Sequence, residues 1–241
     1  MKAMIFAAGL GTRLKPITDA LPKALVQVFG KPLLQHVIEK LVAAGFDEIV
    51  INVHHFPEQI IRFLQDNDYF GLHIHVSDES DRLLDTGGGI RKAACRLNGN
   101  EPFLVHNVDI LSDADLRELY HAGIMQGGLA TLLVSQRKTS RYLLFDDHNR
   151  LKGWINELTG EIKSPYSNFR VGECRRFAFS GIQVISPVIF ERMKNMPGKF
   201  SIIDFYLSVA AEIEIKAHVV PDLQLIDVGK IDSLAKAEGF F

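Results

Sequence analysis

A repeated alternation between short apolar runs and longer amphipathic stretches in the first half of the chain constrains the fold most strongly. The apolar runs at residues 3–7 and 48–53 have the length and content of buried strands. Between them, residues 32–44 place apolar side chains at helical spacing, and Gly45 follows as a typical helix C-cap residue. Strands and helices that alternate in this way form parallel sheets with helices on both faces. The sequence therefore predicts an α/β fold, a three-layer sandwich with a mainly parallel, Rossmann-like sheet.

The regular alternation breaks down in residues 136–180, where short apolar pieces are separated by polar turns. Residues 142–145 and 151–155 are two such pieces. Pieces of this length joined by polar turns are typical of antiparallel hairpins, so we expect a small antiparallel lobe inserted over residues 136–180. A chain of 241 residues could form one domain or two, but no low-complexity linker divides it, which favours a single domain over residues 1–241.

The charge balance and the cysteines limit the partners and the setting of the protein. Lys and Arg number 27 and Asp and Glu 29, a formal net charge of −2, which argues against a broad surface for nucleic acid. Cys95 and Cys174 lie outside any metal-binding or redox spacing and favour a reducing, cytoplasmic setting. The N-terminal apolar run has only about seven residues, too few for a secretory signal or a membrane span. We therefore expect a soluble protein with no nucleic-acid or membrane partner, and no pattern indicates its oligomeric state.

A glycine-rich loop follows the first predicted strand directly. Gly9 and Gly11 would let backbone N–H groups approach a phosphate closely, and polar side chains nearby supply further donors. The candidate phosphate-binding residues are Ala8, Gly9, Gly11, Thr12, Arg13 and Lys23. A triphosphate cradle is one interpretation. An ordinary glycine turn with solvated Arg and Lys side chains is the alternative, because short glycine motifs often match by chance.

Two common phosphate-binding motifs do not fit this loop. Gly9 and Gly11 match the first two positions of the dinucleotide fingerprint, but Leu14 stands where its third glycine belongs. That departure argues against a dinucleotide-binding oxidoreductase. A P-loop needs Gly-Lys-Ser or Gly-Lys-Thr after its first glycine, and no such triplet follows. The loop is therefore a candidate triphosphate site without a Walker lysine.

Residues 7–23 resemble the signature of the sugar-1-phosphate nucleotidyltransferases, Ala-Ala-Gly-x-Gly-Thr-Arg-Leu followed by Pro and later by Pro-Lys. The resemblance implies that the glycine loop binds a nucleoside triphosphate. It also implies that Arg13 neutralises the β and γ phosphates and that Lys23 helps to hold the reacting phosphates. Both residues are therefore expected to be catalytic, and a nucleoside triphosphate and a sugar 1-phosphate are the implied substrates.

Two aspartates at predicted strand ends are candidate metal ligands. Asp109 follows one short apolar run closely, and Asp227 ends another. Two carboxylates from separate strand ends, with phosphate oxygens and water, suit the octahedral oxygen shell of Mg²⁺. A turn or helix N-cap role is the alternative for either residue. The pair resembles the metal-binding aspartates of the family, which makes Mg²⁺ the expected cofactor, although Val108 and Lys230 depart from the residues common beside them.

Two further stretches resemble binding segments of the family. Residues 85–90 contain three successive glycines, and they resemble a run in which backbone groups around Gly88 read the nucleotide base. A flexible start of a helix is the alternative. Residues 179–182 resemble the strand beside the sugar. The candidate sugar-binding residues are Gly181, which would leave space for a hexose, and Asn156 and Glu157, which could accept hydrogen bonds from hydroxyls.

The expected reaction joins a sugar 1-phosphate to a nucleoside triphosphate and releases pyrophosphate. Chain length and the glycine run most resemble N-acetylmuramate-1-phosphate uridylyltransferases, which favours UTP. Mannose-1-phosphate guanylyltransferases and phosphocholine cytidylyltransferases share much of the outline and stay open. A non-catalytic nucleotide-sensing module is the alternative from another class, and the joint presence of Arg13, Lys23, Asp109 and Asp227 argues against it.

Overall fold

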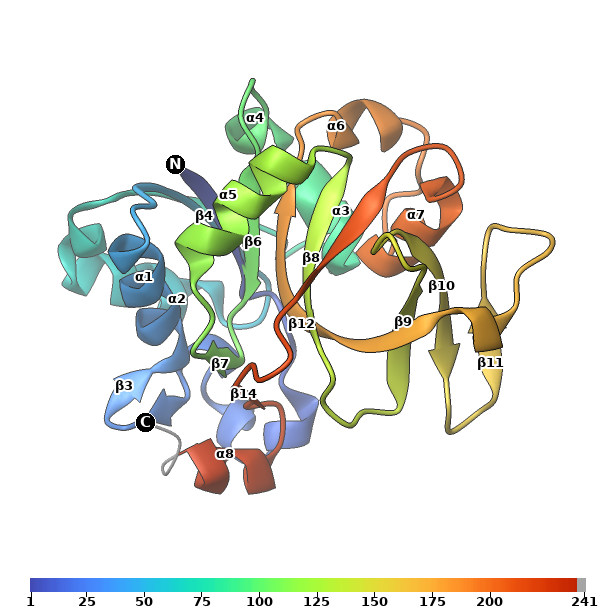
Figure 1. The fold of residues 1–241 in the computed structure, drawn as a ribbon. Helices are drawn as coiled ribbons and strands as arrows, with labels where there is room; N and C mark the ends of the chain where they lie inside the picture. The colour runs from blue at the N-terminus through green and yellow to red at the C-terminus, as the bar shows by residue number, and fades with distance from the viewer. Residues whose placement is uncertain (238–241) are drawn as a thin grey trace.

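The order of the elements follows the alternation of the sequence (Figure 1). The computed structural model describes residues 1–237. Its strands are β1 (Lys2–Phe6), β2 (Gln27–Val28), β3 (Lys31–Pro32), β4 (Glu48–Val53), β5 (His73–Asp78), β6 (Phe103–Asn107), β7 (Ile110–Ser112), β8 (Ala130–Ser135), β9 (Arg141–Phe145), β10 (Leu151–Asn156), β11 (Glu161–Lys163), β12 (Arg175–Ile185), β13 (Ile215–Val219) and β14 (Leu225–Asp227). Its α-helices are α1 (Leu33–Ala43), α2 (Pro57–Asp66), α3 (Asp85–Lys92), α4 (Ala94–Leu97), α5 (Leu116–Gln126), α6 (Ile189–Arg192), α7 (Ile202–Val209) and α8 (Ile231–Ala237).

A ten-stranded sheet forms the centre of the fold. Strands β5, β4, β1 and β6 lie next to one another and run parallel, because helical segments connect them as crossovers. Strand β12 runs antiparallel between β6 and β8, and β13 pairs with β8 in parallel. This mixed, largely parallel sheet confirms the predicted α/β fold class.

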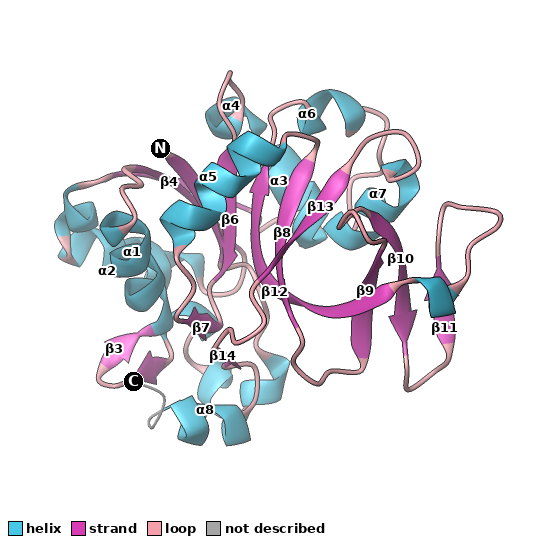
Figure 2. Cartoon of the chain, in the orientation of Figure 1, coloured by secondary structure: helices cyan, strands magenta, loops and turns pink. Residues whose placement is uncertain are grey.

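Helices cover both faces of this sheet (Figure 2). Ala3 and Ile5 of β1 belong to one buried cluster, which also contains buried residues of α1, α2 and α5. Met4 belongs to a second buried cluster, with residues of α3, α6 and α7. Successive strand residues point to opposite faces, so the two clusters lie on opposite sides of the sheet. The predicted three-layer arrangement is therefore confirmed.

The antiparallel strands extend the sheet through β12. Residues 175–177 of this long strand pair with β9, and its later residues pair with β6 and β8. Strand β9 then pairs with β10, and β10 with β11, all antiparallel. Strands β9 and β10 overlap the predicted hairpin pieces at residues 142–145 and 151–155, whereas the short β11 was not predicted. The continuous β12 thus joins these hairpins to the main sheet.

The three successive glycines lie inside helix α3, whereas the sequence predicts a helix over residues 88–97 that begins within the glycine run. A Cβ atom at Gly87 would lie 2.3 Å from the ring of Phe200, and one at Gly88 would lie 2.7 Å from the carbonyl oxygen of Gly198. Glycine inside a helix costs about 1 kcal/mol relative to alanine. At these positions the cost is offset because only glycine lets α3 pack directly on the loop before α7.

The C-terminal segment pairs with residues from the middle of the sequence. Strand β14 pairs antiparallel with β7 in a two-stranded ribbon outside the main sheet. The sequence predicts a closing helix over residues 231–238; α8 overlaps it, and Glu238 lies outside the described range. None of the helices in residues 1–237 is long and apolar enough to span a membrane.

His106 makes the stability of this fold depend on pH. Its ring is fully buried in β6, and burial lowers its pKa from the usual 6.5 to about 4. Between pH 6.5 and pH 4, His106 is therefore neutral in the folded protein and protonated in the unfolded chain. The free energy of unfolding decreases as the pH falls through this range. Between about pH 7.5 and about pH 4.5 we expect His106 to contribute a loss of roughly 2–3 kcal/mol.

Urea unfolding at the two pH values measures this contribution. The non-titrating variant His106→Gln should lose less stability on acidification than the wild type does. His148→Gln is the matched control, because His148 is exposed and lies in a turn. An equal acid sensitivity of the wild type and His106→Gln would contradict the assignment.

Candidate active site

A cavity of about 360 Å³ opens at the carboxyl ends of the parallel strands. Phe6, the last residue of β1, is in register with Asn52 of β4 and Asn107 of β6, so the three strand ends lie level. Ligands of open α/β sheets bind at this edge. The residues that line the cavity are Phe6, Ala8, Gly9, Lys23, Asn52, Glu79, Leu83, Asp85, Thr86, Asn107, Val108, Asp109 and Lys199.

The glycine loop leaves β1 at this edge and is anchored by two residues. Gly11 has a left-handed backbone with φ of +64°, and a Cβ there would lie 2.7 Å from Cγ2 of Thr18. The Thr18 hydroxyl and the Leu14 N–H each donate to the Gly11 carbonyl oxygen at 2.8 Å. Leu14 is fully buried, so its side chain fixes the loop in the core where a dinucleotide fingerprint would have glycine.

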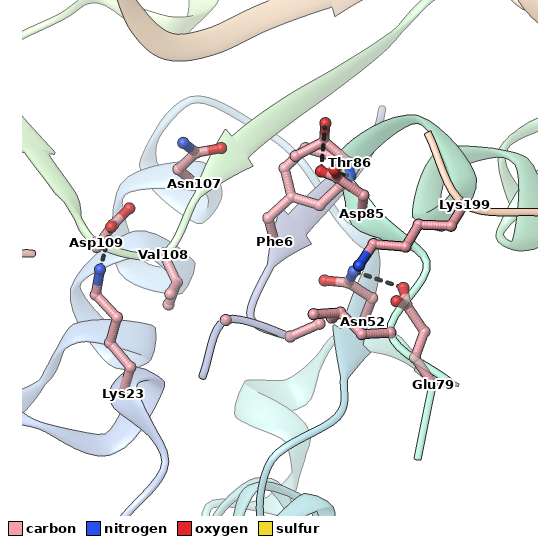
Figure 3. Close-up of a pocket in the computed structure, with 13 residues that line it drawn as sticks. Phe6, Lys23, Asn52, Glu79, Asp85, Thr86, Asn107, Val108, Asp109 and Lys199 are labelled. Atoms are coloured by element: carbon pink, nitrogen blue, oxygen red, sulfur yellow. Dashed lines mark hydrogen bonds and ion pairs between the residues drawn. The ribbon is translucent and has the colours of Figure 1, made fainter. Parts of the chain in front are cut away.

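Lys23 and Asp109 form an ion pair that is largely removed from water. Their side chains are only 10% and 19% exposed. The Lys23 ammonium group donates to Oδ2 of Asp109, and Figure 3 shows the pair on one side of the cavity. Removal of one partner from such a pair leaves an uncompensated charge, which is strongly destabilising. Each residue therefore supports the position of the other.

The β7–β14 ribbon brings Asp227 to the same place. Asp227 is in register with Ile110, the residue that follows Asp109. The N–H of Val228 donates to the carbonyl oxygen of Asp109 at 2.8 Å. The two aspartates therefore become neighbours because a late strand pairs with one from the middle of the chain. The sequence predicted the strand that carries Asp227 and did not predict its partner β7.

Several charged groups act on the carboxylate of Asp227, a residue that stays partly exposed to solvent. Desolvation of its carboxylate raises the pKa of Asp227, and the negative charge of Asp109 raises it further. The positive charges of Lys23 and Arg13 act in the opposite direction. A Cβ at Gly229 would lie 2.6 Å from Oδ1 of Asp227 and 2.8 Å from Nη2 of Arg13, so both groups flank this glycine. The structure thus brings together Arg13, Lys23, Asp109 and Asp227.

The two carboxylates have the chemistry of a shared magnesium site. In the part of the chain that the structure describes, no group of three or more His, Cys, Asp or Glu residues could hold a metal ion by itself. Mg²⁺ is commonly held by one or two carboxylates and completes its shell with substrate phosphates and water. Asp109 and Asp227 offer hard oxygen donors, and the negative charge of Asp109, which after desolvation is the second cause of the raised pKa of Asp227, is a charge that a cation would compensate. The donor set therefore fits Mg²⁺ bound together with a triphosphate.

The sequence analysis missed a buried polar network on the other side of the cavity (Figure 3). Oδ1 of Asn52 accepts from the Ala7 N–H at 2.9 Å, and its Nδ2 donates to Oε1 of Glu79 at 2.7 Å. The second oxygen of Glu79 accepts from the Leu84 N–H at 3.1 Å. The network therefore ties the glycine loop to the segment before α3. A polar Asn inside an apolar strand was a usable signal, whereas nothing marks Glu79.

Some predicted nucleotide ligands lie outside the lining of this cavity. Gly88 is one of them, because its Cβ position faces the loop before α7 and not the cavity. A side chain at Gly88 would therefore disturb helix packing before it could fill a base site. Gly11 and Thr12 also lie outside the lining, as do Arg13, which was predicted to be catalytic, and Asp227, which was predicted to bind the metal.

The predicted sugar ligands are dispersed. Asn156 lines a second cavity of about 480 Å³ between the hairpin strands and α7. Glu157 lies outside that lining and pairs with Arg176 at 2.8 Å. Gly181 has φ of +74°, and a Cβ there would lie 2.7 Å from Nδ2 of Asn107, so the space beside it is occupied by that amide.

Comparisons with known proteins agree with this geometry. The model of the Nucleotidyl transferase family matches residues 2–145. N-acetylmuramate α-1-phosphate uridylyltransferase of Caulobacter vibrioides is 32% identical to this chain over 98% of it and 95% of the relative. Mannose-1-phosphate guanylyltransferase 1 of Arabidopsis thaliana is 29% identical over 95% of this chain, which spans only 62% of that longer protein.

The fold is shared with solved structures as well. HddC of Yersinia pseudotuberculosis, complexed with GMP-PN, has a TM-score of 0.77 to this structure. The likeness covers 99% of this chain and 98% of HddC at 23% identity, which is a likeness of fold. The family match covers more than half of the chain, and the Caulobacter vibrioides relative is matched over nearly its whole length. The chain therefore belongs to the nucleotidyl transferase family.

Proposed function

We propose that this chain transfers a uridylyl group from UTP to a sugar 1-phosphate. The observation that carries the proposal is the convergence of four charged residues, two in the lining of the cavity at the ligand-binding edge of the sheet and two within electrostatic range of them, in a chain of this family. These residues are Arg13, Lys23, Asp109 and Asp227. An oxygen of the sugar 1-phosphate forms a bond to the α phosphorus of UTP, and the bond from that phosphorus to pyrophosphate breaks. The products are a UDP-sugar and pyrophosphate.

The side chains position the phosphates and neutralise their charge. A phosphate monoester with a second pKa near 6 is already largely ionised at neutral pH, so the attack needs no general base. Mg²⁺ held by Asp109 and Asp227 would neutralise charge on the reacting phosphates. Arg13 would stabilise the leaving pyrophosphate, and Lys23 would hold the α phosphate beside Asp109.

The sugar is assigned to the second cavity, beside the antiparallel lobe of residues 136–180. Asn156 and Trp154 contribute to its lining. An aromatic face and a side-chain amide are suitable contacts for the apolar faces and hydroxyls of a sugar ring. Segment 199–203 lies between the cavities, because Lys199 lines the first and Ser201 lines the second. A substrate that spans both cavities would place its phosphate near the carboxylates.

The choice of UTP is supported by the comparison over full length. The Caulobacter vibrioides relative, named as an N-acetylmuramate α-1-phosphate uridylyltransferase, is matched over 95% of its length. The guanylyltransferase of Arabidopsis thaliana is longer, and this chain spans 62% of it. The first relative also makes N-acetylmuramate α-1-phosphate the first acceptor to examine.

We expect kcat/KM for UTP to exceed that for GTP by about 30-fold or more. A base with a different pattern of donors and acceptors leaves polar groups of the site without hydrogen-bond partners, and each such group costs about 1–3 kcal/mol. Pyrophosphate release is measured for UTP, GTP, CTP and dTTP, each with N-acetylmuramate 1-phosphate and mannose 1-phosphate. Reactions without a sugar phosphate are the control. A higher kcat/KM for GTP with mannose 1-phosphate would refute the uridylyl assignment and leave the nucleotidyl transfer intact.

A further inference from the structure

Arg137 carries a buried donor that no residue described here satisfies. It lies in the connection between β8 and β9, outside every motif that the sequence analysis selected. Its side chain is half-buried, and Nη2 donates to the carbonyl oxygen of Phe179 at 2.9 Å. Its Nε is enclosed and has no hydrogen-bond partner in residues 1–237. An unpaired buried donor on a cation costs free energy, but the enclosed Nε is out of reach of a ligand, so the remaining N–H groups of the guanidinium are the donors that face a ligand in the adjoining cavity.

Arg137 also lies between the carboxylate site and the second cavity. It lines that cavity together with Asn156 and Phe179. Its positive charge opposes the rise in the pKa of Asp227 that desolvation causes, so the guanidinium and that carboxylate lie within electrostatic range of each other. The connection from β8 to β9 and strand β14 lie at the same end of the molecule (Figure 1). A ligand bound by Arg137 would therefore lie in the second cavity, within electrostatic range of the carboxylate site.

The second cavity has positive charge that its own acids do not compensate. Lys163 pairs with Asp204 at 2.9 Å and lies 3.7 Å from Glu161, so these three charges sum to −1, and the two arginines bring the lining to a net charge of +1. Arg137 and Arg141 line the same cavity, and neither has a carboxylate within ion-pair distance in the described part of the chain. Two unpaired arginines favour an anionic ligand. In the proposed reaction, the anion that must reach from the sugar to the α phosphorus is the phosphate of the acceptor.

We propose that Arg137 binds the phosphate of the sugar 1-phosphate and aims its attacking oxygen at the α phosphorus; this inference rests on the proposed function. The planar guanidinium offers several donors in a fixed arrangement, which suits a phosphate better than a single ammonium does. The bond to the Phe179 carbonyl oxygen orients the group, so its remaining donors are free for the substrate. Correct orientation of the attacking group is a large part of catalysis in phosphoryl transfer.

Kinetics of Arg137→Lys and Arg137→Met test the inference. We expect KM for the sugar 1-phosphate to rise about tenfold in Arg137→Lys, because the lysine ammonium group keeps the charge but not the planar set of guanidinium donors. The rise should be larger in Arg137→Met, which also removes the charge. The KM for UTP should stay within about twofold of the wild type. Arg176→Met is the matched control, since Arg176 belongs to the same lobe, pairs with Glu157 and does not line the cavity. Calorimetric titration of sugar 1-phosphate in the presence of a non-hydrolysable UTP analogue gives a second measurement.

The outcomes separate this inference from the proposed function. An unchanged KM for the sugar 1-phosphate in a folded Arg137→Met variant of an active enzyme would overturn the inference. A rise confined to the KM for UTP would assign Arg137 to the triphosphate and overturn it as well. If the wild type shows no turnover, the proposed function fails; equal calorimetric affinities of the wild type and Arg137→Met for sugar 1-phosphate then overturn the inference too. Circular dichroism of each variant reports its folding.

Discussion

Replacement of Asp109 by Asn is expected to lower kcat by at least about 10³-fold at saturating UTP, sugar 1-phosphate and Mg²⁺. The amide keeps the shape of the side chain and removes the negative charge that faces Lys23 and, with Asp227, would hold the metal. Steady-state pyrophosphate release with Mg²⁺ as the sole divalent cation measures the loss. Asp109→Asn is preferred to Asp109→Ala because alanine would also leave a cavity beside the nearly buried Lys23.

Asp222→Asn is the matched control for this experiment. Asp222 is exposed in the turn that precedes β14, so its replacement should leave kcat within about twofold of the wild type. Urea unfolding of both variants separates loss of chemistry from loss of fold. Activity of Asp109→Asn within tenfold of the wild type would refute the assignment of Asp109 to the metal site.

Replacement of Arg13 by Lys is expected to lower kcat by about 10²-fold while KM for the sugar 1-phosphate changes little. The charge is retained, but the planar group that lies beside Gly229 and Asp227 is lost. Stabilisation of a leaving pyrophosphate needs several donors directed at its oxygens, which a lysine cannot supply. Initial rates over a grid of UTP and sugar 1-phosphate concentrations separate kcat from the two KM values.

Lys15→Arg controls for a general effect of charge exchange in this loop. Lys15 is exposed and pairs with Asp19 at 2.8 Å, so its replacement should leave the kinetics unchanged. If Arg13→Lys weakened only the binding of sugar 1-phosphate, with kcat and UTP binding intact, Arg13 would contact the sugar 1-phosphate and would not stabilise the leaving pyrophosphate.

The parallel part of the fold was predictable because its signals are local. The strand predicted at residues 48–53 has the same bounds as β4, and the helix predicted at residues 32–44 differs from α1 by one residue at each end. Apolar runs and helical periodicity survive in these segments because both faces of the sheet are covered. The glycine loop was found for a similar reason, since its whole motif lies in one stretch.

Long-range pairing was beyond the reach of local patterns. Strand β7 has only three residues, and its partner β14 lies more than a hundred residues later. The proximity of Asp109 and Asp227 depends on this ribbon. The sequence therefore predicted both aspartates from their places at strand ends and from a resemblance, whereas the structure supplies the physical reason for their meeting.

The side chains that sequence reasoning missed are those whose roles come from their partners. Glu79 is one acid among several in its segment, and only burial beside Asn52 distinguishes it. Arg137 is one of many basic residues, and only its unpaired Nε distinguishes it. Gly88 was selected for a base-reading role from its glycine run, but the structure places it against Gly198. Close packing and binding both favour glycine, and a sequence alone does not separate the two causes.

The most direct measurement follows both products of one reaction that contains the purified chain, UTP, N-acetylmuramate 1-phosphate and Mg²⁺. We predict that pyrophosphate and a UDP-sugar form in equal amounts, that neither forms without the sugar phosphate, and that chelation of the metal stops both. Pyrophosphate release without the sugar phosphate would indicate hydrolysis of the triphosphate. Absence of both products with all common nucleoside triphosphates and a panel of sugar 1-phosphates would contradict nucleotidyl transfer and favour a nucleotide-sensing role.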